Sequence, residues 1–119
     1  MGWVRSVVDY LKADTPDSLA SLDRDAIYAV VQELDRDGYL NRSMDGWEVA
    51  RWFKENGQGI YESGESFASG YCLDVDGEAI KALPDYLRLS FDWSGVWSRL
   101  QWFDAIRIGG RVFVFRNDS

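Results

Sequence analysis

The chain has 119 residues and a formal net charge of −7, from 20 Asp and Glu side chains against 13 Lys and Arg. It is 46% hydrophobic and 15% aromatic, a composition that excludes an intrinsically disordered chain. Because Lys and Arg drive nucleic-acid binding by neutralising phosphates, the acidic balance argues against direct nucleic-acid binding and favours a basic partner surface. The length predicts one small domain over 1–119, with two lobes as an alternative: a mainly helical 1–56 and an α+β 57–119.

The chain contains no histidine and one cysteine, Cys72. The commonest general base and metal ligand is therefore missing, and neither an intrachain disulfide nor a thiolate metal cluster can form. We expect a protein that is not an enzyme and needs no metal or cofactor, in a reduced, cytosolic compartment. Residues 1–14 are interrupted by Arg5, Asp9 and Lys12, so the sequence predicts neither a signal peptide nor a membrane span there.

Three helices are predicted in the first half. Apolar residues recur at helical spacing over 3–12, and Thr15-Pro16 then opens a brief turn. A longer helix begins at Ser21 or Asp23 and stops at Gly38, which suits a left-handed helix end. A third helix follows the Asp45-Gly46 turn and ends near residue 57.

The second half gives weaker signals before residue 84. A turn or two of helix is expected over 65–71, and Asp76-Gly77 indicates a hairpin, although its neighbours also tolerate helix. Pro84 ends the preceding element, and a helix is predicted from residue 93 to about 102. Alternating runs around Gly109-Gly110 predict a β-hairpin, with Arg107, Arg111 and Arg116 on one polar face. The predicted fold is α+β: three to four helices packed on a small antiparallel sheet with a C-terminal β-hairpin.

Two alternative interpretations involve the acidic segments. Asp74, Asp76 and Glu78 resemble the opening of a calcium loop, but the glycine comes too early and the closing acid is missing, so a surface turn is favoured. The segment 22–40 resembles the third helix and first strand of a winged helix. Its acidic residues would repel a DNA backbone, which leaves a winged-helix-like protein–protein interaction or adaptor module as the alternative function.

The acidic clusters are the candidate partner-binding residues. Carboxylates spaced like phosphates can occupy a basic groove that evolved for DNA, with gains from electrostatic steering and counterion release. The alternative is an ordinary solvated surface with weak ion pairs. The candidates are Asp23, Asp25, Glu33, Asp35, Asp37, Glu62, Glu65, Asp74, Asp76 and Glu78.

Several motifs resemble those of the ArdA-type antirestriction proteins, small acidic DNA mimics of mobile elements. The first lies within 53–71 and comprises Phe53, Gly59, Tyr61, Ser63, Glu65, Phe67 and Ala68. The others are Leu83-Pro84-Asp85-Tyr86-Leu87, Phe91-Asp92-Trp93, Trp97-Ser98-Arg99-Leu100 and the closing strand 110–115. The likeness covers roughly residues 26–116 and is weak before Phe53.

The resemblance implies an anti-defence inhibitor, encoded by a phage or plasmid, that blocks the DNA-binding site of a restriction enzyme or CRISPR effector. It also implies a possible homodimer. Family members are typically longer, with three small domains, and this chain resembles the last two. The shorter length and milder charge raise the alternative that the fold serves a new target, as an anti-CRISPR protein would.

Overall fold

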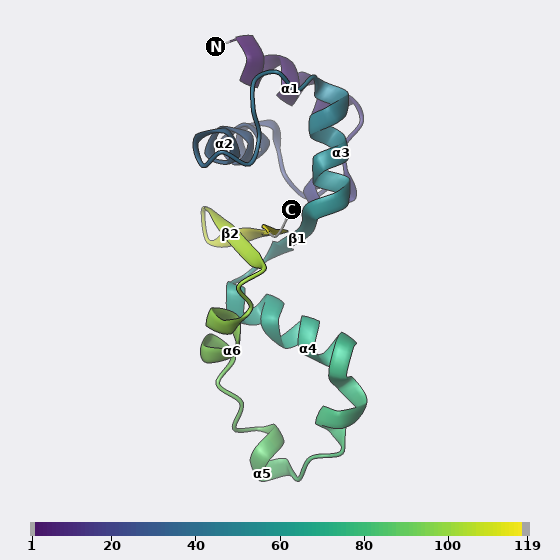
Figure 1. Ribbon diagram of the computed structural model, residues 1–119, viewed down its shortest axis with the longest axis vertical. Helices are drawn as coiled ribbons and strands as arrows, with labels where there is room; N and C mark the ends of the chain where they lie inside the picture. The colour runs from purple at the N-terminus through teal and green to yellow at the C-terminus, as the bar shows by residue number, and fades with distance from the viewer. Residues whose placement is uncertain (1, 118–119) are drawn as a thin grey trace.

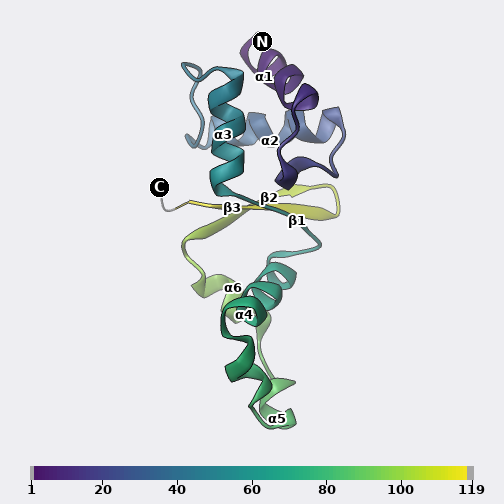
Figure 2. The same cartoon turned by 90° about the vertical axis from the view of Figure 1, so that its right-hand side faces the viewer.

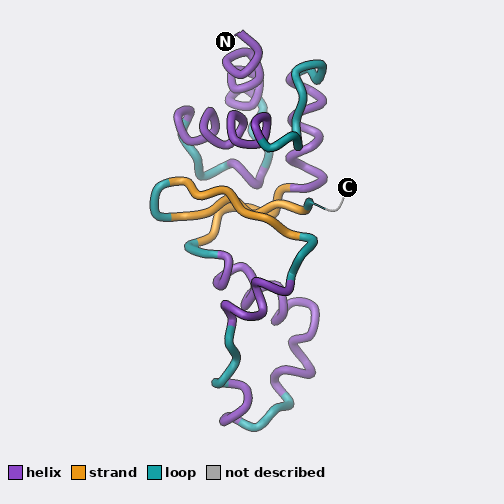
Figure 3. The backbone as a smooth tube through the Cα atoms, turned by 60° about the vertical axis from the view of Figure 1, so that its left-hand side comes forward, coloured by secondary structure: helices purple, strands orange, loops and turns teal. Residues whose placement is uncertain are grey.

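The computed structural model describes residues 2–117, which form a three-stranded sheet with helices on both faces (Figures 1, 2 and 3). One face carries α1 (Gly2–Ala13), η1 (Asp17–Leu19), α2 (Arg24–Arg36) and α3 (Gly46–Asn56). Beyond the other face lie α4 (Gly64–Lys81), α5 (Asp85–Arg88) and α6 (Trp93–Arg99). The strands are β1 (Gly57–Tyr61), β2 (Phe103–Ile108) and β3 (Arg111–Arg116). The molecule is elongated, with extents of 55 × 26 × 22 Å.

The N-terminal helices are delimited by the caps that their sequences predict. The Asp23 carboxylate accepts the amide of Ala26 at 2.8 Å and starts α2. Asp45 and Glu48 form a reciprocal capping box that starts α3. At the end of α2, Gly38 takes a φ of +87°, a conformation that glycine adopts without a Cβ penalty. The apolar stripes of α1, α2 and α3 then meet in one core.

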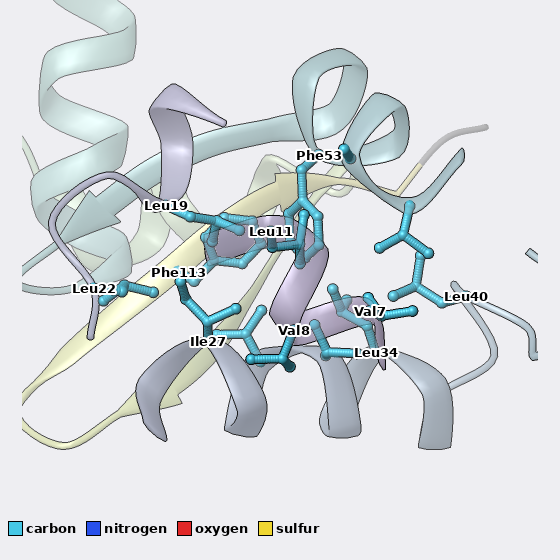
Figure 4. Close-up of a cluster of buried hydrophobic side chains, with 14 of the residues drawn as sticks. Val7, Val8, Leu11, Leu19, Leu22, Ile27, Leu34, Leu40, Phe53 and Phe113 are labelled. Atoms are coloured by element: carbon cyan, nitrogen blue, oxygen red, sulfur yellow. The ribbon is translucent and has the colours of Figure 1, made fainter. Parts of the chain in front are cut away.

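That core lies between the three helices and the sheet (Figure 4). Phe53 of α3 and Phe113 of β3 are both fully buried, and their rings pack edge-on with centroids 5.6 Å apart. Phe115 extends the contact to Tyr39, at 4.9 Å between ring centroids. The labelled members in Figure 4 are Val7, Val8, Leu11, Leu19, Leu22, Ile27, Leu34, Leu40, Phe53 and Phe113.

The sheet has the order β1-β3-β2, with both strand pairs antiparallel. Alternate residues of β3 serve the two cores: Phe113 and Phe115 face the N-terminal helices, whereas Val112 and Val114 belong to the second core. The hairpin predicted around Gly109-Gly110 is confirmed, and Gly109 has a φ of +59°. The strict alternation of the strand explains how one small sheet supports two cores.

The second core is built around one aromatic ring. Phe67 of α4 contacts Tyr61, Tyr71, Trp97 and Phe103, with ring centroids 4.8 to 5.9 Å apart. Beyond this cluster, α4 continues past non-helical backbone at Asp76 (φ −120°, ψ 23°), and α5 lies at the far end of the molecule from α1 (Figures 1 and 2). The aromatic residues of the sequence thus hold the first half of α4 on the sheet.

The α+β class and the C-terminal hairpin are confirmed. The structure adds to the prediction: six α-helices lie within residues 2–117, and β1 pairs with β3 although the sequence offered only Gly57–Tyr61 with two glycines. A register irregularity between Gly57 and Gly59 accommodates this weak strand.

The structure differs from one prediction, the common face of three arginines, and from two of the alternatives, the hairpin at Asp76-Gly77 and the winged helix. Asp76-Gly77 lies inside α4 and forms no hairpin, since the residues on both sides continue the helix. Arg107 pairs with Val112 across the two strands, so the two side chains share one face of the sheet, and Arg116 lies on the same face as Val112. Arg111 immediately precedes Val112 in β3, so its side chain lies on the other face. The strand that a winged helix would place after Gly38 is also missing: the Tyr39 and Leu40 amides both donate to the Leu34 carbonyl instead.

Candidate partner-binding surface

Most candidate acids of α2 and its flanks already interact with groups of the same segment. Asp23 caps the helix. Glu33 pairs with Arg36, and Arg36 also lies 4.0 Å from Asp37. Asp35 pairs with Arg42, at 3.3 Å between Nη2 and Oδ2. Asp25 is exposed and lines a hollow of about 660 Å³ between α1 and α2, whose other lining residues are Gly2, Arg5, Arg24 and Tyr28.

The candidate acids in α4 and just before it differ from those of α2. Within residues 2–117 they make no ion pair, and all of them are exposed. The sequence explains why, because no Lys or Arg occurs between Lys54 and Lys81. At about 1.5 Å per helical residue, Glu65 and Asp74 lie roughly 14 Å apart along the regular part of α4, which ends where the backbone leaves helical geometry at Asp76. We call this set the α4 carboxylates: Glu62, Glu65, Asp74, Asp76 and Glu78.

The structure therefore divides the ten candidates into three groups. The α4 carboxylates lie in one segment and make no ion pair within residues 2–117, and Glu33, Asp35 and Asp37 lie against arginines. Asp23 caps α2, and Asp25 is exposed without an ion pair in the described part of the chain. An exposed ion pair contributes little to stability, but it does reduce the negative potential that a partner would meet. The α4 carboxylates are consequently the stronger candidates for binding a basic surface.

Charge is also unevenly distributed along the chain. Residues 57–104 contain eight Asp and Glu against three Lys and Arg, while residues 105–117 contain three arginines and no acid. The distal half is thus strongly acidic and the C-terminal hairpin is basic. Such a separation orients an approaching charged partner before contact.

Two nearby groups are affected by the α4 carboxylates. Burial raises the pKa of the Tyr61 hydroxyl above its ordinary value of 10.0, and the negative charge of Asp74 raises this pKa further. Burial likewise raises the pKa of the Cys72 thiol, with a second contribution from Asp76. A negative field from α4 therefore extends over the surface around both side chains.

The acids do not form a metal centre or a buried catalytic site in the described part of the chain. No group of three His, Cys, Asp or Glu residues within 2–117 could hold an ion, which is against the calcium interpretation of Asp74, Asp76 and Glu78. These three residues border a shallow hollow of about 380 Å³ at the bend of α4. No charged residue among 2–117 is buried; the one buried polar side-chain atom in this range without a hydrogen-bond partner is Ser18 Oγ. None of the helices in this range is long and apolar enough to cross a lipid bilayer.

Sequence analysis missed a set of exposed apolar side chains beside the α4 carboxylates. Leu73 and Val75 of α4 are 44% and 61% exposed, and Tyr86, Leu87 and Leu89 around α5 are 72%, 45% and 78% exposed. At the other end of the molecule, Trp47 is 56% exposed and lies under the Arg51 guanidinium.

Residues of the antirestriction-like motifs hold the fold together. Phe53, Phe67 and Ala68 are buried. The Ser63 hydroxyl accepts a hydrogen bond of 3.1 Å from the backbone amide of Ser66 and caps the start of α4. The Asp92 carboxylate accepts a hydrogen bond of 3.2 Å from the backbone amide of Gly95 and caps the start of α6. These positions account for the motifs as signatures of a fold.

Comparison of the chain with protein-family models, with curated proteins and with solved structures finds no match.

Proposed function

We propose that this protein is a non-catalytic anti-defence inhibitor, encoded by a phage or plasmid, that acts in the bacterial cytosol. It binds a restriction enzyme or a CRISPR effector and occupies the effector's DNA-binding site. The observation that carries the proposal is the run of uncompensated α4 carboxylates on an elongated molecule.

The dimensions suit this role. Each strand of duplex DNA presents a phosphate about every 3.4 Å of axis. Glu65 and Asp74 span roughly 14 Å of regular helix, which corresponds to about four phosphate spacings of one strand. The full 55 Å length corresponds to roughly 16 base pairs. One copy of the chain is therefore long enough to cover a short DNA site.

The energetics also favour a basic groove as the binding site. Lys and Arg in such a groove hold counterions, and carboxylates that replace phosphates release them. Because the α4 carboxylates make no ion pair within residues 2–117, they bind a partner without first breaking one. Their approach is accelerated by long-range attraction, which weakens as salt is added.

A competition assay tests the proposal. Purified restriction enzymes and CRISPR effectors are each loaded with a fluorescent duplex that carries their recognition site, and the chain is titrated in. We expect displacement of the duplex from at least one effector, in a stoichiometric and salt-sensitive manner, with no change in the chain or the DNA. Direct binding of the chain to the duplex, or no displacement from any effector, would contradict the proposal.

A further inference from the structure

The distal arm, residues 73–92, is the part of the molecule with the least internal support. Ile80 is its single buried residue, and α5 buries none. Five of the eight large hydrophobic side chains that are exposed within residues 2–117 lie on this arm: Leu73, Val75, Tyr86, Leu87 and Leu89. Their concentration on one segment, in place of a scatter over the whole surface, marks the arm as a candidate interaction site.

The arm is acidic as well as apolar. It carries five carboxylates against two basic side chains, and one of these, Arg88, is paired with Asp85 at 2.6 Å. A surface that complements the arm must therefore offer positive charge around an apolar centre. This composition disfavours a nucleic acid or an anionic membrane, since both would be repelled.

The apolar side chains point in different directions. Leu73 and Val75 are two residues apart in α4, which places them about 200° apart around a helix of 3.6 residues per turn, and both are exposed. In a twofold dimer, one self-complementary patch of each copy is buried, so one of these two side chains would stay exposed to water. A dimer through the arm would also bring together two arms that each carry a net charge of −3. A cleft in a partner protein, by contrast, covers the arm on both sides and can bury both side chains.

We propose that the distal arm inserts into a cleft of the target protein that has an apolar floor and a basic rim. Tyr86 and Leu89, the most exposed of its apolar side chains, are the anchors, and the carboxylates of the arm face the basic rim. This inference rests on the proposed function and adds to it an anchor that does not depend on charge. Buried aromatic and aliphatic anchors typically dominate the binding energy of an interface.

The test uses the full chain, the variant Tyr86→Ser/Leu89→Ser, and the control Tyr28→Ser/Trp47→Ser, which removes exposed apolar residues at the other end of the molecule. The probes are a fluorescent amphipathic Leu/Lys peptide and an oligolysine of equal charge. We expect the wild-type chain and the control to bind the Leu/Lys peptide at least about tenfold more tightly than oligolysine, and the arm variant to lose this preference. Equal binding of both peptides, binding of neither, or an unchanged preference in the arm variant would overturn the inference.

Analytical ultracentrifugation of the same proteins tests the alternative that the arm binds a second copy of this chain. If the wild-type chain is a dimer and the arm variant a monomer, the arm is a dimer interface and the inference is wrong. The two proposals also fail separately. If the arm variant still displaces DNA from an effector as well as the wild type, the inference fails while the proposed function stands. If the peptide preference is lost as expected but no effector releases DNA, the proposed function fails instead.

Discussion

Two glycines of α4 give opposite expectations for the same substitution. At Gly70 a Cβ would meet no atom within 4 Å, so Gly70→Ala gains only helix propensity and stabilises the protein by about 0.5–1 kcal/mol. At Gly64 a Cβ would overlap the indole of Trp97, with Cδ2 at 2.6 Å. Overpacking costs about 1–3 kcal/mol, and at the first helical residue the gain in propensity is small. Gly64→Ala therefore destabilises the protein by about 1–2 kcal/mol.

Urea unfolding followed by far-UV circular dichroism measures both values. Trp97 is also a local reporter, because it packs on Phe67 at 5.9 Å between ring centroids. We expect its near-UV signal to change in Gly64→Ala and to stay constant in Gly70→Ala. If the two variants are equally stabilised, α4 does not pack on α6 through Trp97, and the second core is wrongly described.

Three further predictions concern other parts of the fold. Phe53→Ala removes a fully buried ring and should lower the unfolding free energy by about 3–5 kcal/mol in urea titration. Asp45→Ala removes the capping box of α3 and should lower the unfolding free energy by about 1 kcal/mol. Asp45→Asn, which keeps a capping oxygen, should retain most of this stability. Burial, and then the charge of Asp104 with its hydrogen bond at 3.3 Å, raise the pKa of Tyr39 above 10.0. Stability from this shift is present below pH 10.0 and is lost as pH rises through the higher folded-state pKa. Asp104→Asn should lower the Tyr39 pKa in a spectrophotometric titration.

Local signals predicted the N-terminal helices and the hairpin well. Asp23 and Asp45 cap helix starts and Gly38 ends a helix, and each does so through groups only a few residues away. Such caps and helix ends can be recognised from the residue types alone. The hairpin around Gly109-Gly110 is equally local. These elements needed no knowledge of the rest of the fold.

The missed elements depend on distant partners. β1 has only Ile60 and Tyr61 as strand formers, and it becomes a strand because β3 pairs with it from more than fifty residues away. At Asp76-Gly77 the local turn signal is partly expressed, because the backbone departs from helical φ/ψ at Asp76 while α4 continues on both sides. The same limit applies to the site. Acid clusters are visible in the sequence, but only the structure separates Asp35, which is paired with Arg42, from Asp74, which is not.

The most direct test of the central claim compares two variants of equal charge in the DNA-displacement assay. Each neutralises four carboxylates and so changes the net charge from −7 to −3. The first removes α4 carboxylates: Glu65→Gln, Asp74→Asn, Asp76→Asn and Glu78→Gln. The second removes carboxylates that are already ion-paired: Asp9→Asn, Glu33→Gln, Asp35→Asn and Glu55→Gln.

Both variants should keep the fold, because exposed ion pairs contribute little to stability. The α4 variant should displace DNA about tenfold less effectively than the wild type, with a flatter dependence on salt, and the ion-paired variant should remain close to the wild type. Equal losses in the two variants would mean that net charge alone matters, and the placement of uncompensated carboxylates on α4 would then have no part in inhibition.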